Sequence, residues 1–349
     1  MRTVYWEDNK VVMIDQTKLP YSEELIKTRD LKRIADAIYR LELRGGPAIG
    51  ATACYGMAIA GQDSKGLSKE ETLKKLQEAR IILNVRPTAS NLVWGLDRME
   101  AFAKDFLLKN SVDDLGAAML EEAEKVADEE VDVNNRMAAF GASLIPYHTP
   151  TTILTNCNTG SLCTVDVGHV MATPFLAHKQ GKPVHVYTCE TRPRLQGAKL
   201  NVYELDKRGV PYTLIPDNHA AMLMAMGKID MVMVGADRMV ANGDAAAKVG
   251  CYNLAVQAKH HNIPYFFFAT TATIDMATEN GAGIEIEQRD VDEVRKINGV
   301  QVTIPNANVE NYAFDVTPNE LMTAIITEEG IIFPPYKDKI AEIMAKATR

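Results

Sequence analysis

Few of the features that mark specialised protein classes occur in this chain of 349 residues. Its five cysteines are an odd number without framework spacing, and no two of them form a CxxC pair. This pattern argues against a disulfide scaffold or a cysteine-ligated zinc site, and it is typical of a reducing cytoplasm. The seven histidines form no HExxH motif, so the sequence gives no sign of a metal site.

Long apolar runs and an excess of positive charge are also missing. No run approaches the ~20 residues that span a membrane. The first residues, MRTVYWEDNKVV, hold no apolar signal segment, so we expect a cytoplasmic protein without a membrane partner. The formal net charge of −8 argues against a nucleic-acid partner, because phosphate backbones need a basic patch. A small phosphorylated ligand is compatible with this charge, since it needs only a few local cations.

The remaining pattern is that of an ordinary soluble protein with two domains. Residues 1–139 are predicted to form a mainly helical N-terminal domain that starts with a small β-hairpin, Val4–Trp6 and Val11–Ile14. Residues 140–349 alternate apolar runs with helical segments, which is the βαβ pattern of a parallel sheet covered on both faces. We therefore predict an α/β protein with a doubly wound, Rossmann-like second domain. No GxGxxG motif follows its first strand, so a dinucleotide site is not expected.

The expected elements follow from hydrophobic periodicity. From Ser22 to about Arg136 the pattern is helical, with helices expected over residues 31–41, 44–60, 68–83, 91–107 and 112–140. In the second domain the expected strands are Thr152–Leu154, Val184–Thr188, Tyr212–Ile215, Met231–Gly235 and Tyr265–Ala269. Two further helices are expected at Pro318–Thr327 and Lys337–Ala347.

The stretch from Thr151 to Gly168 is the centre of the predicted second domain. Its strand delivers Cys157 to a carboxyl end, and Asn158–Ser161 then turn into an expected helix. Ligands of parallel sheets bind outside such strand ends, and a helix N-terminus there favours anions and a thiolate. The alternative is that Cys157 is a small apolar residue that closes a turn.

Polar sequences also follow three other predicted strands. They are ETRPRLQG from Glu190, GADR from Gly235 with the later NGD and Lys248, and TTATID from Thr270. Carboxyl ends of parallel strands share one edge of a sheet, so we expect these sequences to face one crevice together with Cys157. Each one alone could be a solvated turn or a structural ion pair.

Taken together, the motifs resemble the methylthioribose-1-phosphate isomerase family. They are RGGPAIG, RPTASNL, CNTG, ETRPRLQGAKL, GADR, NGD and NYAFDVTPNEL, and they occur in the order found in the family. That family is related to ribose-1,5-bisphosphate isomerases and to regulatory subunits of a translation-initiation nucleotide-exchange factor. The resemblance implies an aldose–ketose isomerase, an intramolecular oxidoreductase of methionine or 5-deoxy-sugar salvage. It also implies a homodimer formed through the C-terminal domain, and no cofactor or metal.

The resemblance implies a sugar-phosphate substrate, either 5-methylthioribose 1-phosphate or 5-deoxyribose 1-phosphate. It assigns catalysis to Cys157 and Asp237. Asp237 would exchange protons with the sugar oxygens if burial keeps it protonated, and Cys157 would handle the hydrogen at carbons 1 and 2. An enolate and a hydride shift both fit. The substrate-binding positions implied are Arg44, Gly45, Gly46, Arg86, Gln196, Ala247 and Lys248.

Several alternatives accompany these assignments. Arg44 could instead cap a helix C-terminus, and Arg192 or Arg194 could brace a loop. The sequence also departs from the family pattern at Asn156, usually His, at Gly46, usually Ala, and at Ala247, usually Asn. A Pro of the family is replaced by Thr270 or Thr271.

These departures leave the two catalytic positions intact but keep three functions open. The first is an isomerase that acts on a 5-modified ribose 1-phosphate. The second is a ribose-1,5-bisphosphate isomerase, which would need a second phosphate site. The third is a non-catalytic regulatory subunit, for which the retained pair of Cys157 and Asp237 would have no use.

Overall fold

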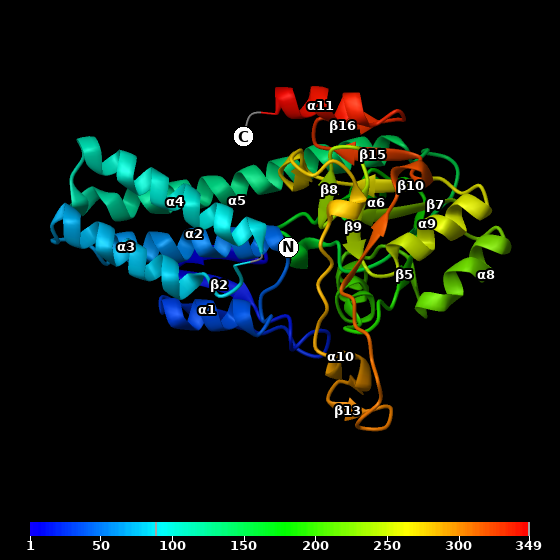
Figure 1. The fold of residues 1–349 in the computed structure, drawn as a ribbon, viewed down its shortest axis with the longest axis horizontal. Helices are drawn as coiled ribbons and strands as arrows, with labels where there is room; N and C mark the ends of the chain where they lie inside the picture. The colour runs from blue at the N-terminus through cyan, green and yellow to red at the C-terminus, as the bar shows by residue number, and fades with distance from the viewer. Residues whose placement is uncertain (88, 348–349) are drawn as a thin grey trace. The chain divides into compact units, whose positions relative to one another are not determined.

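The computed structural model describes residues 1–87 and 89–347, and these divide into two compact units. One unit contains Met1–Asp132 together with Ser161–Gly168, and the other contains Val133–Gly160 together with His169–Arg349. The fold-class prediction is confirmed, because one unit is mainly helical and the other is built on a mostly parallel sheet (Figure 1). None of the helices in the described residues is long and apolar enough to cross a membrane.

The helical unit begins with an antiparallel sheet of the strands β1, β2 and β3, in that order. The elements of this unit are β1 Val4–Glu7, β2 Lys10–Ile14, β3 Leu25–Thr28, α1 Leu31–Tyr39, α2 Gly46–Gln62, α3 Lys69–Leu83, α4 Ser90–Lys109 and the first part of α5 Val112–Ser143. The predicted hairpin is confirmed. The helical prediction from Ser22 onward is wrong for β3, whose register pairs Val11 with Thr28 and adds a third strand to the hairpin.

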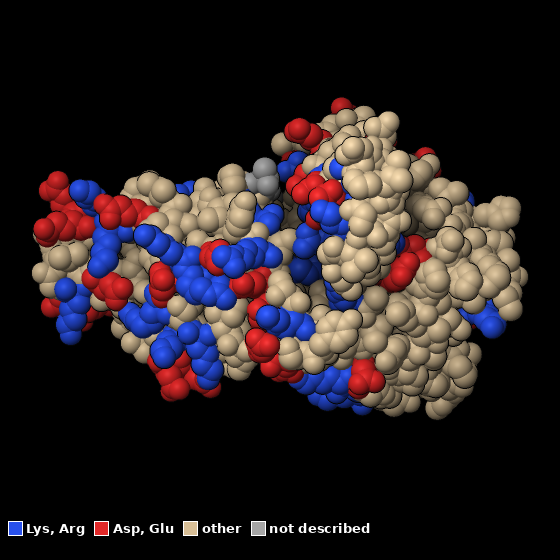
Figure 2. All heavy atoms as spheres, turned by 90° about the horizontal axis from the view of Figure 1, so that it is seen from below, with Lys and Arg blue, Asp and Glu red and all other residues tan. Residues whose placement is uncertain are grey.

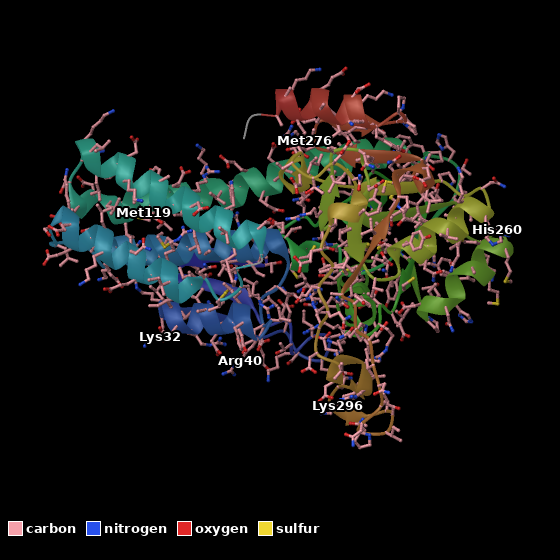
Figure 3. The ribbon with its side chains drawn as sticks, viewed as in Figure 1. Lys32, Arg40, Met119, His260, Met276 and Lys296 are labelled. Atoms are coloured by element: carbon pink, nitrogen blue, oxygen red, sulfur yellow. The ribbon has the colours of Figure 1, made fainter. Side chains whose placement is uncertain are left out.

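Helix α2 forms the centre of this unit. It is apolar on all sides, and its residues from Ala48 to Gly61 are buried. Glycines allow its neighbours to approach closely: a Cβ on Gly95 of α4 would lie 2.8 Å from the carbonyl oxygen of Gly50. Met119 of α5, labelled in Figure 3, is fully buried in the same core. The small residues of α2 therefore serve helix–helix packing.

The second unit is organised around a sheet with the strand order β16-β15-β10-β7-β4-β5-β6. All neighbours in it are parallel except β15 and β16. The bounds are β4 Thr151–Thr155, β5 Val184–Cys189, β6 Tyr212–Ile215, β7 Met231–Gly235, β10 Tyr265–Phe268, β15 Ala324–Thr327 and β16 Gly330–Ile332. The helices of this unit are α6 Ala172–Lys179, α7 Val202–Lys207, α8 Ala220–Ala225, α9 Cys251–His260, α10 Asp292–Arg295 and α11 Lys337–Lys346.

Both faces of the central strands are buried. On β7, Val232 and Val234 pack into one hydrophobic cluster, whereas Met231 and Met233 pack into the cluster on the opposite face. This alternation is the consequence of helices covering a parallel sheet on both sides. Each of the five strands predicted for this domain corresponds to a strand of the structure.

One predicted helix in this unit is wrong. Pro318–Thr327 contains only a short 3₁₀ turn, Asn319–Leu321, followed by β15, whose four residues are all buried. The run of Ala324–Thr327 is β-branched and apolar, which favours a buried strand over a helix. β15 pairs with β10 in parallel and with β16 as an antiparallel hairpin.

A smaller sheet has the strand order β11-β8-β9-β14, and its strands alternate along the chain with strands of the main sheet. Its strands are β8 Arg238–Val240, β9 Ala245–Lys248, β11 Ile274–Asp275 and β14 Phe314–Thr317. A projecting segment, residues 286–313, leaves it between β11 and β14 and carries α10, β12 Lys296–Ile297 and β13 Val300–Gln301 (Figure 1). Lys296, labelled in Figure 3, belongs to its small hairpin.

Candidate active site

The strand order places Cys157 and Asp237 at the point where the sheet reverses its winding. From β4 the chain proceeds to β5 and β6 on one side, and then returns to add β7 and β10 on the other side of β4. Cys157 follows the end of β4 by two residues, and Asp237 follows the end of β7 by two residues. In doubly wound sheets the ligand crevice opens at this reversal, outside the carboxyl ends of the two strands.

Cys157 sits in a turn with unusual backbone geometry. Its φ is +68°, in the left-handed region that non-glycine residues rarely occupy. Its backbone N–H donates to the Thr191 hydroxyl oxygen at 2.9 Å, and its side chain is partly exposed. The prediction that a helix begins at this turn is wrong, because only a 3₁₀ turn, Ser161–Cys163, follows and the next α-helix begins at Ala172. A helix dipole therefore does not explain any activation of the thiol.

Asp237 is fixed through its backbone, and its side chain is exposed. Its N–H donates to the carbonyl oxygen of Ala246 at 2.9 Å, which ties the end of β7 to β9. The exposure does not meet the condition set from the sequence, that burial raises the pKa of Asp237 and keeps it protonated.

Lys248 is a buried cation that lies within electrostatic reach of Cys157 and Asp237. The side chain lies at the end of β9 and is 3% exposed. Burial lowers the pKa of Lys248, while the nearby Cys157 and Asp237 partly oppose that shift. Among the described residues its Nζ has no hydrogen-bond partner. A buried unpaired ammonium is costly, which favours a role in holding an anionic ligand.

Gln196 also has a buried polar atom without a partner among the described residues. It is 6% exposed, and its Oε1 has no hydrogen-bond partner within the part of the chain that the structure describes. The following residue, Gly197, could not be replaced, since a Cβ there would lie 1.7 Å from the carbonyl oxygen of Cys189 at the end of β5. Packing of glycine against β5 therefore holds Gln196 close to the strand end.

Ala247 offers no polar group at its position. Its methyl side chain is fully buried, and its backbone pairs with Asp315 of β14. The contact that an asparagine would make here is therefore absent from the side chain. The neighbouring departure, Asn156, is also buried, and its Nδ2 donates to the carbonyl oxygen of Val249 at 3.2 Å.

Arg192 and Arg194 bind the projecting segment. Arg192 donates from Nη2 to the carbonyl oxygen of Val294 at 3.1 Å. Arg194 forms an ion pair with Glu293 at 2.6 Å. Both arginines are therefore bracing residues, as the alternative interpretation of the sequence allowed.

The other predicted substrate residues belong to the helical unit. Arg44 is partly buried and precedes α2. Gly45 has a φ of +97°, and a Cβ there would lie 2.1 Å from the carbonyl oxygen of Cys163, so the position requires glycine. Gly46 is exposed and begins α2.

Arg86 has a clear structural contact. Its Nε and Nη2 donate to the carbonyl oxygens of Ile38 and Tyr39, at 3.2 and 2.8 Å, at the end of α1. The helix-capping interpretation considered for Arg44 therefore applies to Arg86. Thr88 of the RPTASNL motif lies outside the described residues.

The second unit thus brings Cys157, Asp237 and Lys248 within electrostatic reach of one another, and it also contains Gln196 and Ala247. Sequence reasoning missed two polar side chains that contact Cys157, namely Thr191 and Asn201, and a third, Asp217, that holds the backbone of Thr191. The only signal for the first two was their location in or just after the ETRPRLQGAKL motif. No group of three or more His, Cys, Asp or Glu side chains among the described residues is arranged to hold a metal ion.

Comparison with known proteins identifies relatives over the whole length. Residues 42–334 match the Initiation factor 2 subunit family. The methylthioribose-1-phosphate isomerase of Chloroflexus aurantiacus is 47% identical over 337 residues, which cover 96% of each chain. The structure of 5-methylthioribose 1-phosphate isomerase from Pyrococcus horikoshii superposes with a TM-score of 0.93, at 42% identity over 98% of this chain and 96% of that one. A structure described as translation initiation factor eIF-2B, subunit delta, from A. fulgidus has a TM-score of 0.91, at 39% identity over 99% of both chains.

Proposed function

Because this chain belongs to the Initiation factor 2 subunit family and, within it, to the methylthioribose-1-phosphate isomerases, we propose that it converts 5-methylthioribose 1-phosphate into 5-methylthioribulose 1-phosphate. The protein is an aldose–ketose sugar-phosphate isomerase of methionine salvage. The observation that carries the proposal is the occurrence of Cys157 and Asp237 after adjacent strands, where the winding of the sheet reverses.

The chemistry requires two groups with different tasks. The phosphate on the anomeric oxygen prevents the ring from opening by loss of a hydroxyl proton, so the ring oxygen has to be protonated as its bond to carbon 1 breaks. A hydrogen then moves from carbon 2 to carbon 1, and the oxygen on carbon 2 becomes a carbonyl. Asp237 would exchange protons with the sugar oxygens, and Cys157 would act at carbons 1 and 2, either through an enolate or by assisting a hydride shift. Neither route requires a cofactor or a metal.

Substrate binding is proposed for Arg44, Gly45, Gly46, Arg86, Gln196, Ala247 and Lys248. Support is strongest for Lys248 and Gln196, because each buries a polar atom without a protein partner among the described residues. Support is weaker for Arg86, two of whose donors are already used at the end of α1. Ala247 can contribute only through its backbone.

5-Deoxyribose 1-phosphate is proposed as a second substrate of the same site. The side chains at Asn156 and Ala247 differ from the family pattern near the catalytic pair, which supports a slightly different pocket. A non-catalytic regulatory role is favoured by one observation, the similarity to the structure described as a translation initiation factor subunit. The presence of Cys157, Asp237 and the buried Lys248 supports the enzyme instead.

We also propose a cytoplasmic homodimer that associates through the second unit. Free thiols at all five cysteines support the cytoplasm. Partly exposed apolar side chains on α8 and α9 support the dimer; they are Met222, Met226, Tyr252 and Val256. Figure 2 shows few charged side chains at the right-hand end, where α8 and α9 lie. The proposed division into domains remains residues 1–139 and 140–349.

The function is tested by following 5-methylthioribose 1-phosphate with the purified protein by phosphorus NMR. We expect the signal of the anomeric phosphate to be replaced by that of a primary ketose phosphate without release of inorganic phosphate. The matched control is Cys157→Ser, which should leave the substrate signal unchanged on the same time scale. Binding of the sugar phosphate without any conversion by the wild-type protein would contradict the enzyme and favour the regulatory role.

A further inference from the structure

The backbone of Cys157 is held by side chains on both sides. Its N–H donates to the hydroxyl oxygen of Thr191 at 2.9 Å, and its carbonyl oxygen accepts from Nδ2 of Asn201 at 2.7 Å. Thr191 is 1% exposed and Asn201 is 0% exposed, so water does not compete for these bonds. A left-handed conformation is unfavourable for a non-glycine residue, and these two bonds help to hold Cys157 in it.

The hydroxyl of Thr191 is oriented for this task. Two acceptors lie within reach of its single proton, Oδ1 of Asn156 at 2.9 Å and the carbonyl oxygen of Cys189 at 3.1 Å. Because the proton points toward one of them, a lone pair of the hydroxyl is left for the N–H of Cys157. A valine at position 191 would keep the shape of the side chain and lose this acceptor.

Thr191 is itself strained and supported. Its φ is +65°, which is a genuine outlier for a β-branched residue. The carboxylate of Asp217 holds it there by accepting the N–H of Thr191 and that of Arg192, both at 2.7 Å. Asp217 follows β6, Thr191 follows β5 and Cys157 follows β4, so each strand end supports that of the neighbouring strand.

From this arrangement we infer that Thr191 is a positioning residue for Cys157, supported by Asp217 and Asn201. The inference rests on the proposed function, in which Cys157 acts on carbons 1 and 2 of the sugar. Strain that is held by buried hydrogen bonds sets the direction of the thiol before the substrate binds. Loss of the Thr191 hydroxyl would let the backbone of residue 157 relax and would displace the sulfur, and a displacement of about 1 Å can cost roughly 100-fold in rate.

The test compares three variants of the full-length protein. Thr191→Val removes the hydroxyl and preserves the shape, and Thr191→Ser retains the hydroxyl. Thr151→Val is the matched control, because Thr151 is also buried, its hydroxyl also donates to a backbone carbonyl oxygen, that of Thr149 at 3.2 Å, and it begins β4 at the opposite end of the strand from Cys157. The measurements are kcat, KM and the midpoint of thermal unfolding, together with the rate of alkylation of Cys157 by iodoacetamide, resolved by mass spectrometry.

We expect Thr191→Val to lower kcat by about 10–100-fold with KM within about threefold of the wild type. Thr191→Ser and Thr151→Val should stay within about threefold in both constants. Equal kcat values for Thr191→Val and the wild type would overturn the inference, as would an equal loss of kcat in Thr191→Ser. If Thr191→Val does not fold, Asp217→Asn replaces it, and an unchanged kcat in that variant also overturns the inference.

Alkylation separates failure of this inference from failure of the proposed function. If the wild type converts neither 5-modified sugar phosphate, the proposed function fails, but the reactivity of the thiol can still be measured. Thr191→Val should change the alkylation rate of Cys157 by more than about threefold and leave that of Cys163, the other partly exposed cysteine, unchanged. Identical rates at Cys157 in Thr191→Val, Thr191→Ser and the wild type would overturn the positioning role by itself.

Discussion

Arg194 is fixed by Glu293, with Nη1 of the arginine 2.6 Å from Oε1 of the carboxylate across 99 residues of sequence. Glu293 also accepts from Nδ2 of Asn311 at 3.2 Å. The ion pair therefore ties the loop that contains Gln196 to the projecting segment. The charge of Arg194 is thus neutralised by a structural contact.

Removal of this ion pair should affect stability more than catalysis. We expect Arg194→Ala and Glu293→Gln each to lower the free energy of unfolding by up to about 1 kcal/mol, because the pair is partly exposed. The midpoint of thermal unfolding would fall by about 2–4 °C. Arg2→Ala, which removes a more exposed ion pair with Asp128, is the control and should have a smaller effect. A loss of more than tenfold in kcat/KM without a change in the unfolding midpoint would instead assign Arg194 to the substrate.

Cys157 and Asp237 should be indispensable for turnover. We expect Cys157→Ser and Asp237→Asn each to lower kcat by at least ~100-fold, the usual scale for a positioned acid or base. Both substitutions nearly preserve volume, so circular dichroism and the unfolding midpoint should stay close to those of the wild type. Cys163→Ser, at the other partly exposed cysteine, is the control and should retain activity. Near-normal turnover in either catalytic variant would remove that residue from the mechanism.

Burial of the Lys248 ammonium should lower the stability of the fold and strengthen binding of the substrate phosphate. Its folded-state pKa lies below the ordinary value of 10.5 because of burial, so between these two pKa values the unfolded chain binds more protons than the folded one. Stability contributed by this group therefore rises with pH through that alkaline window, and the buried charge is unfavourable below it. We expect Lys248→Met to be at least as stable as the wild type at neutral pH and to lose this pH dependence.

The same variant should bind the substrate poorly. Loss of a charge-assisted contact with the phosphate would raise KM by roughly 10–100-fold. In the wild type, KM should rise as the pH increases and Lys248 loses its proton. Thermal unfolding and steady-state kinetics at several pH values check both statements. A variant that is destabilised at neutral pH and has an unchanged KM would show that Lys248 is structural.

The sequence was sufficient to predict the secondary-structure elements whose residues are buried on all sides. The central strands β7 and β10 of the sheet are continuous apolar runs, which favour buried strands. The short strand β3 was missed because four half-exposed residues carry too little periodicity to be separated from the helices around them. β15 was predicted as part of a helix, although its β-branched, fully buried residues favour a strand.

The site could be predicted only where chain topology determines it. The rule that parallel strand ends share an edge predicts that Cys157 and the GADR sequence face one crevice, and the family resemblance then proposes Cys157 and Asp237 as the catalytic pair. The contacts of Thr191 and Asn201 with Cys157 connect residues 34 and 44 positions apart through single side-chain atoms. No local pattern encodes such contacts. The left-handed backbone at Cys157 and Thr191 is equally invisible in the sequence, since neither residue type favours it.

The last prediction concerns the group at the 5-position of the sugar. A methylthio group and the methyl of a 5-deoxy sugar are both apolar and need an apolar pocket. The family resemblance implies that Gly46 of the RGGPAIG segment is a substrate-binding residue. Within the helical unit, Ala48 and Ile49 of this segment are buried in the core, whereas Gly46 is exposed. An added methyl at Gly46 would lie 3.3 Å from Cγ of Asn91, a contact that a small side-chain shift relieves.

We expect both 5-modified ribose 1-phosphates to be substrates, with a preference of at most ~10–200-fold in kcat/KM, because one small apolar group changes transition-state binding by only ~1–3 kcal/mol. Gly46→Ala should shift that preference without abolishing either activity. Ribose 1,5-bisphosphate should be a much poorer substrate, since its second phosphate would be desolvated against apolar side chains. Steady-state kinetics with these three sugars and ribose 1-phosphate measure the preference directly. Efficient turnover of the bisphosphate, with little activity on either 5-modified sugar, would show that the group at the 5-position binds in a phosphate site and not in an apolar pocket.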